Sequence, residues 1–118
     1  MRSHLETGRE GELLAANWIL QRGFQILERN WRHRRYEVDI IALKNDTLHI
    51  IEVKTKRTGK FGHPEAMAFP KKLGHLIEAV GVYMEIHQEW TKICFDILAI
   101  KIERDNVVEV FWIEDVYP

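Results

Sequence analysis

Three charged side chains stand in two neighbouring apolar segments, at a spacing that could bind a divalent cation. Glu52 and Lys54 interrupt the apolar segment "TLHIIEVKTK", and Asp39 lies in the preceding segment "YEVDIIAL". Side chains two residues apart in a strand share a face, so Glu52 and Lys54 point the same way. If Asn45 and Asp46 form a two-residue turn between antiparallel strands, Asp39 lies opposite Glu52, with Cα atoms about 4.5–5.5 Å apart.

Two opposed carboxylates destabilise a sheet unless a cation lies between them. Mg²⁺ prefers hard oxygen ligands, so Asp39 and Glu52 together predict a metal site, with Lys54 beside it as a fixed positive charge. Two alternatives remain open at this point. In the same register Glu37 faces Lys54, so part of the group would be a cross-strand ion pair on a solvated face. A three-residue loop would shift the pairing by one residue and would separate Asp39 from Glu52.

The elements that must position these residues follow one another in the order α–β–β–β–α–β–β. The capping box of Thr7 and Glu10 predicts a helix that begins at Gly8 and ends at Gly23. Hydrophobic periodicity and turn signals give the remaining boundaries: a short strand at 24–28, a basic linker "RNWRHRR" at 29–35, strands at 36–43 and 47–56, a loop at 57–64, a helix over about 70–87, and strands at 93–103 and 107–113. We therefore expect an α/β fold of one domain over residues 1–118, with helices flanking a mixed central sheet.

Composition excludes several classes of protein. Of the 118 residues, 46% are hydrophobic and 30% are charged, which is typical of a globular domain. No apolar run has the length of a membrane span, and the polar start "MRSHLETGRE" is unlike a secretory signal. Because Cys94 is the single cysteine, no internal disulfide can form, and we expect a cytoplasmic protein with Cys94 in the core.

The net charge of −1 conceals an uneven distribution of charge along the chain. Residues 29–72 hold 11 basic against 5 acidic side chains, and the remaining residues hold 6 against 13. Such asymmetry can give a neutral protein a basic face that contacts phosphates without sequence preference. The candidates flank the predicted acid pair: Arg29, Arg32, Arg34, Arg35, Lys56, Arg57 and Lys60. The alternative is a solvated surface, and Trp31 among them either stacks on an unpaired base or packs on the core.

A family pattern contains the same residues. The acid of "YEVDII" followed by "IIEVK" resembles the PD-(D/E)XK nuclease motif. The runs "GREGELLAANWIL", "GFQILERNWR", "EVDIIAL" and "IIEVKTKRTGKFG" follow one another with the spacing of the YraN family, over about residues 8–84, and "CFDILAI" resembles that family's later strand. The family resembles the restriction-endonuclease-like superfamily and the archaeal Holliday-junction resolvases.

The resemblance implies a restriction-endonuclease-like core and a Mg²⁺- or Mn²⁺-dependent endonuclease that hydrolyses phosphodiester bonds of DNA, with branched or structured DNA as a candidate substrate. It implies that Glu12 completes a metal site with Asp39 and Glu52, and that Lys54 is the motif lysine. It also matches Glu37 to an acid of the family motif and Lys72 (or the adjacent Lys71) to a lysine that could reach a phosphate. Related resolvases act as dimers, so a homodimer is one expected state.

One departure from the family pattern favours a second interpretation. Tyr36 stands where the family usually has glycine, and it either crowds the site or stacks on a base. A nucleic-acid-binding module without catalysis therefore stays open, as does a protein-interaction domain, which the near-zero net charge allows. The six histidines lack zinc-ligand spacing. Asp96 is expected to be a buried structural carboxylate, with a place near the site as the alternative.

Overall fold

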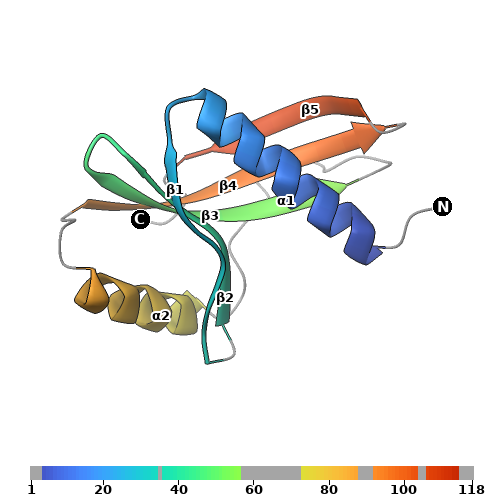
Figure 1. Cartoon of the computed structure of the whole chain (residues 1–118). Coiled ribbons are helices and arrows are strands. Elements are labelled where there is room, and N and C mark those ends of the chain that lie inside the picture. Colours follow the sequence, from blue (N-terminus) through green and yellow to red (C-terminus); the bar gives the residue numbers. More distant parts are fainter. Residues whose placement is uncertain (1–3, 35, 57–72, 88–91, 104–105, 115–118) are drawn as a thin grey trace.

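The fold is a five-stranded mixed sheet with one helix on each face (Figure 1), seen in a computed structural model that describes residues 4–34, 36–56, 73–87, 92–103 and 106–114. The elements are α1 (His4–Gln21), β1 (Gln25–His33), β2 (Tyr36–Lys44), β3 (Thr47–Lys56), α2 (Leu73–Ile86), β4 (Lys92–Glu103) and β5 (Asn106–Ile113). This order confirms the α–β–β–β–α–β–β prediction.

The strands lie in the order β1-β2-β3-β4-β5, and all neighbours are antiparallel except β3 and β4, which are parallel. A parallel pair needs a long crossover connection, and the segment between β3 and β4 contains α2. The sheet is therefore mixed, as the sequence predicts.

Two hydrophobic clusters fill the space between the sheet and its helices. On the α1 side, Ala15 and Ile19 pack with Ile51 and Leu98, all of which are fully buried. On the opposite side, Tyr83 of α2 and its neighbours pack against the other face of β2 and β3. Both faces of the central strands are covered, which explains their nearly continuous apolar sequence.

The turn between β2 and β3 has the predicted geometry. Asn45 and Asp46 both have positive φ, at 49° and 63°, as a two-residue hairpin turn of type I′ requires. Lys44 consequently pairs with Thr47, and the register predicted from the two-residue turn is confirmed.

Two predicted boundaries differ clearly from the structure. The helix begins at His4, so Thr7 and Glu10 lie inside α1 rather than at its start. The expected basic linker is mostly strand, because β1 extends to His33 through backbone pairing with β2. Its charged side chains are tolerated because β1 is an edge strand with exposed positions. Trp31 packs against Tyr83 with ring centroids 5.3 Å apart, so its packing on the core is confirmed.

Candidate metal centre

Asp39 lies where β2 separates from β3. Backbone pairing of the two strands ends at Ile40 and Ile51, one pair before Asp39 and Glu52 would meet. The Asp39 carboxylate occupies the next position along the ladder, because the Val53 amide donates a hydrogen bond of 2.8 Å to Asp39 Oδ2. A side chain thus satisfies a backbone donor that has lost its strand partner.

The β1–β2 ladder is interrupted at the same place. Its pairs pass from Arg29–Ile40 to Trp31–Val38, without a pair between Asn30 and Asp39. Val38 packs in the cluster on the α2 side, whereas Ile40, two residues later, packs on the α1 side. In a regular strand these two side chains would share a face. The alternation therefore breaks at Asp39, which lies between the two faces of the sheet.

Three carboxylates come together at this break. Ligand oxygens of Glu12 from α1 and of Glu37 and Asp39 from β2 all lie within 4.8 Å of one another. The side-chain amide of Asn30 lies between two of them, and with its nitrogen facing the acids it donates 3.2 Å hydrogen bonds to Glu12 Oε2 and Glu37 Oε1. Asn30 adopts a φ of 53°, a left-handed conformation that asparagine tolerates better than most residues.

The close approach of α1 to the sheet brings Glu12 into this group. A Cβ on Gly11 would lie 1.8 Å from Thr55 Oγ1 of β3, so only glycine allows this helix–strand distance. Gly11 and Asn30 are both functional candidates that the sequence analysis missed. The glycine-containing run "GREGE" was a signal for the first of them, and nothing in the sequence indicated the second.

Burial and mutual repulsion hold these acids in an unfavourable environment. Burial raises the pKa of Asp39 to about 7; the Val53 hydrogen bond opposes this rise in pKa, and the charges of Glu12, Glu52 and Glu37 add to it. Burial followed by the charge of Glu37 also raises the pKa of Glu12. Ionising these acids is therefore costly in the absence of a cation, and a bound cation would favour their charged form.

Glu52 approaches the group from the other side of the sheet. By strand alternation it shares the face of Leu48 and Ile50, and it does not join the group of acids within 4.8 Å. Its Oε1 lies 3.9 Å from Lys54 Nζ, whereas its buried Oε2 has no hydrogen-bond partner among the residues that the structure describes. Burial raises the pKa of Glu52, and Lys54 opposes the rise. The structure thus places Glu52 and Lys54 next to each other and couples Glu52 electrostatically to Asp39.

Glu37 is held by other partners. Its Oε2 accepts a hydrogen bond of 2.8 Å from Arg32 Nε and lies 2.8 Å from Arg32 Nη2, and its Oε1 faces Asn30. The alternative cross-strand pair between Glu37 and Lys54 is absent from the ion pairs of the described residues. Glu37 therefore belongs to the group of acids and is also paired with Arg32, whereas Glu52 keeps one carboxylate oxygen without a hydrogen-bond partner among the described residues.

Tyr36 lies beside both strand acids. It packs at the edge of the cluster on the α2 side, and burial, Glu52 and Asp39, in that order, raise the pKa of its hydroxyl to about 12. The phenol therefore stays protonated beside these two carboxylates.

The predicted phosphate-contacting residues are only partly described. Arg32 pairs with Glu37, and Arg34 Nη1 lies 3.4 Å from Glu78 Oε1 of α2. Lys56 is exposed at the end of β3. Arg29 is also exposed, and its charge lowers the pKa of Glu12 in opposition to burial. Four further candidates fall outside the described residues: Arg35, Arg57, Lys60 and Lys72.

An open mixed sheet with a helix on each face and an acid cluster where β2 leaves β3 defines an α/β protein with a candidate metal centre. The chain belongs to the uncharacterised protein family UPF0102, whose model matches residues 11–100. This match confirms the family resemblance seen in the sequence, and it covers the site from Gly11 through β3.

Several relatives in this family align over most of their length. A UPF0102 protein of Christiangramia forsetii is 41% identical over 100 residues, which cover 85% of this chain and 84% of the relative. A UPF0102 protein of Prosthecochloris aestuarii is 36% identical, with 92% and 95% of the two chains covered. One of Rhodococcus opacus is 36% identical over 118 residues, covering 99% of this chain and 100% of the relative. None of the described helices is long and apolar enough to cross a membrane.

Proposed function

We propose that this protein is a Mg²⁺- or Mn²⁺-dependent endonuclease that hydrolyses phosphodiester bonds of DNA, with branched or structured DNA as the substrate. The observation that carries the proposal is the group of carboxylates around Asp39, whose pKa is raised to about 7 by burial and neighbouring charge. A protein that only binds nucleic acid gains little from clustered acids near phosphates, because like charges repel. The resemblance to the PD-(D/E)XK motif supports the same reaction.

The donor set fits a hard divalent cation. All candidate ligands are carboxylates, and octahedral Mg²⁺ with bonds of about 2.0–2.1 Å places its ligand oxygens roughly 3–4 Å apart. Oxygens within 4.8 Å of one another need only small side-chain movements to reach that spacing. Glu52 lies outside this group, and its buried Oε2 has no hydrogen-bond partner among the described residues. We propose that Glu12 and Asp39 hold the cation, with Glu52 as a third ligand that must move toward them and with Glu37 and Asn30 as their support.

When bound, the metal would supply Lewis-acid stabilisation of the phosphoryl oxygens and would lower the pKa of an attacking water. The chain itself supplies positioning. Val53 fixes the Asp39 carboxylate through its 2.8 Å hydrogen bond, and the Lys54 ammonium, 3.9 Å from Glu52, adds positive charge where negative charge develops in the transition state. Gly11 keeps α1 close enough for Glu12 to reach the same point.

The test is cleavage of plasmid and of four-way-junction DNA with Mg²⁺ or Mn²⁺, followed by chelator. Cutting should require the metal, should stop with chelator and should be lost in Asp39→Asn. Asp46→Asn is the matched control, because it makes the same chemical change in the β2–β3 turn at a φ of 63°, which asparagine tolerates. Cutting that survives Asp39→Asn or excess chelator would refute the proposal.

The second candidate is a nucleic-acid-binding module without catalysis. Tyr36 favours it, because a tyrosine beside Asp39 and Glu52, where the family usually has glycine, would crowd the approach of a substrate. Junction DNA that is bound but not cut under any metal condition selects this function. If the protein neither binds nor cuts DNA, the remaining hypothesis is a protein-interaction domain.

A further inference from the structure

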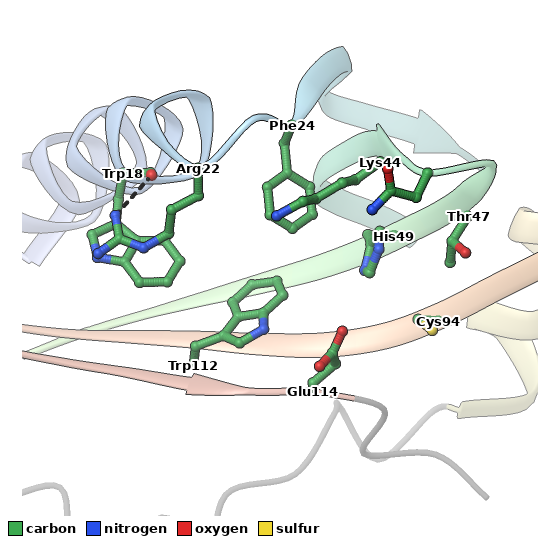
Figure 2. A pocket seen from close by; sticks show the side chains of 10 residues that line it. Trp18, Arg22, Phe24, Lys44, Thr47, His49, Cys94, Trp112 and Glu114 are labelled. Carbon is green, nitrogen blue, oxygen red and sulfur yellow. Dashed lines mark hydrogen bonds between the residues drawn. The ribbon is translucent and has the colours of Figure 1, made fainter.

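A cavity of about 520 Å³ opens near the carboxyl end of α1, away from the acid cluster (Figure 2). Its walls come from the end of α1, the turn between β2 and β3, and the ends of β4 and β5. This volume is in the range of small-molecule sites. None of the residues assigned to the metal centre lines it, so it needs an explanation of its own.

Aromatic rings form much of the wall. Trp112 of β5 lies 5.8 Å from Trp18 of α1 and 5.7 Å from Phe24, measured between ring centroids. Phe24 in turn meets the ring of His49 edge-on at 5.0 Å. Figure 2 shows Phe24 and Trp112 approaching the cavity from opposite sides. Such walls favour a flat, aromatic ligand, because a planar ring can stack on them or meet them edge-on.

Two cations line the same cavity and lie over these rings. The Arg22 guanidinium carbon is 3.5 Å from the centroid of Trp18, and Lys44 Nζ is 4.8 Å from that of Phe24. Arg22 Nη1 also donates a 3.1 Å hydrogen bond to the carbonyl oxygen of Trp18, and within the described part of the chain neither cation pairs with a carboxylate. An exposed cation–π contact contributes about 0.5–1 kcal/mol, less than a charge-assisted hydrogen bond of about 1.5–3 kcal/mol. An anionic group on the ligand would therefore draw both cations to itself.

One lining residue, His49, belongs to a buried polar pair. His49 Nδ1 lies 2.6 Å from Oδ2 of Asp96; His49 is 5% exposed and Asp96 is fully buried. This contact confirms that Asp96 is a buried, hydrogen-bonded carboxylate, and it fixes the orientation of the imidazole. Since Nδ1 is engaged, Nε2 is the ring nitrogen left to contact a ligand. Burying such a pair costs solvation that an apolar pair would not.

The cavity is not a simple anion trap, because Glu114 also lines it. Its carboxylate repels an anion and accepts hydrogen bonds from amino or hydroxyl groups. A ligand that suits the whole lining combines a flat ring, hydrogen-bond donors and one anionic group. Nucleotides have all three, whereas inorganic phosphate lacks the first.

We propose that this cavity binds a nucleotide, with the base against the aromatic wall and His49, and the phosphate at Arg22 and Lys44. The nucleotide comes from one of two sources that share this chemistry: a free nucleoside monophosphate, or an unpaired nucleotide of a DNA strand. The first source is independent of the proposed nuclease function. The second rests on it and would make the cavity the place where an unpaired nucleotide of the substrate is recognised.

The test is calorimetric titration of the whole protein, in excess chelator, with the four deoxynucleoside monophosphates. Deoxyadenosine and inorganic phosphate serve as probes of the two halves of the ligand. At least one monophosphate should bind saturably and about tenfold or more tightly than either half. In the double variant Arg22→Ala/Lys44→Ala its affinity should fall roughly tenfold or more, because two charge-assisted contacts are lost.

Arg9→Ala is the matched control, since it removes an exposed arginine near the other end of α1; its binding should equal that of the wild type. Competition with a single-stranded oligonucleotide then identifies the source: displacement indicates a strand nucleotide, and no displacement indicates a free nucleotide. The proposal is overturned if no monophosphate binds saturably, or if the double variant, folded by circular dichroism, binds as the wild type does. The titration is carried out in chelator, so nucleotide binding does not depend on the proposed metal centre. If Asp39→Asn loses DNA cleavage and still binds the nucleotide, neither the binding nor the cavity is refuted.

Discussion

Replacing Asp39 by asparagine should stabilise the metal-free protein at neutral and alkaline pH. Burial and neighbouring acids raise the pKa of Asp39 from 3.8 to about 7 in the folded state only. A shift of about three units corresponds to roughly 4 kcal/mol at 1.36 kcal/mol per unit. Because Glu12 and Glu52 share part of this repulsion, we expect about 2–4 kcal/mol, or roughly 10 °C in the melting temperature of a domain of this size. Asparagine keeps an oxygen that can accept the Val53 hydrogen bond.

The direction of the pH dependence follows from proton binding. Between about pH 4 and pH 7 the folded state holds a proton on Asp39 that the unfolded state has lost. The contribution of Asp39 to the free energy of unfolding is therefore highest below pH 4 and falls as the pH rises to about 7. The raised pKa values of Glu12 and Glu52 act in the same direction, so the difference between wild type and Asp39→Asn isolates the contribution of Asp39.

Urea unfolding from pH 4 to pH 8, in chelator and then with Mg²⁺, measures this difference. The two proteins should be equally stable near pH 4, and the variant should be more stable at pH 8. Mg²⁺ at about tenfold over its Kd should add roughly 1.4 kcal/mol to the wild type and much less to the variant. Asp46→Asn should follow the wild type throughout. If Asp39→Asn lowers stability equally at all pH values, Asp39 is a structural carboxylate and the metal-site argument fails.

Three further substitutions test the support of the site. Gly11→Ala should lower the stability by about 1–3 kcal/mol and remove most of the DNA cleavage, because its Cβ would meet Thr55. Gly8→Ala is the control: its Cβ would meet nothing within 4 Å, so the stability should be unchanged or slightly higher. A Gly11→Ala variant with unchanged stability and cleavage would contradict the close packing. Asn30→Gly keeps the positive φ but removes the side-chain amide that lies between two acids. The free energy of unfolding at pH 8 should therefore fall by about 1 kcal/mol, which is measured as a lower melting temperature. Tyr36→Gly should lower stability by about 2–4 kcal/mol and raise the nicking rate, and an unchanged rate in the folded variant would show that Tyr36 does not limit access.

Local patterns predicted much of the fold. Asn45-Asp46 fixed the hairpin register, because both residues accept the positive φ that a two-residue turn needs. Helical spacing placed α2 within a few residues. The sequence analysis ended this strand too early, because residues Arg29 to His33 form a strand only through their pairing with β2. No local sequence pattern indicates that pairing. The helix start was misplaced because a capping-box pattern can also occur within a helix.

The sequence predicted most of the residues of the candidate site, but it did not predict how they are arranged in space. Asp39, Glu52 and Lys54 were found because charge in an apolar strand is conspicuous, and the family resemblance added Glu12. Asn30 could not be found, because its role depends on a backbone conformation and on two acids that are distant in sequence. The single-domain boundary, the metal and the DNA substrate stay predictions.

The irregularity at Asp39 explains why the acids meet around it rather than across a regular ladder. The predicted register was correct, and a continued ladder would have set Asp39 directly opposite Glu52. Instead the strands part after Ile40, and the carboxylate takes the Val53 amide that the ladder leaves unpaired. This break turns Asp39 toward the gap between the two faces, where Glu12 reaches it from the α1 side and Glu52 influences it from the other. A regular strand could not present one carboxylate to both sides, so the lost backbone pair is the structural condition for a shared cation.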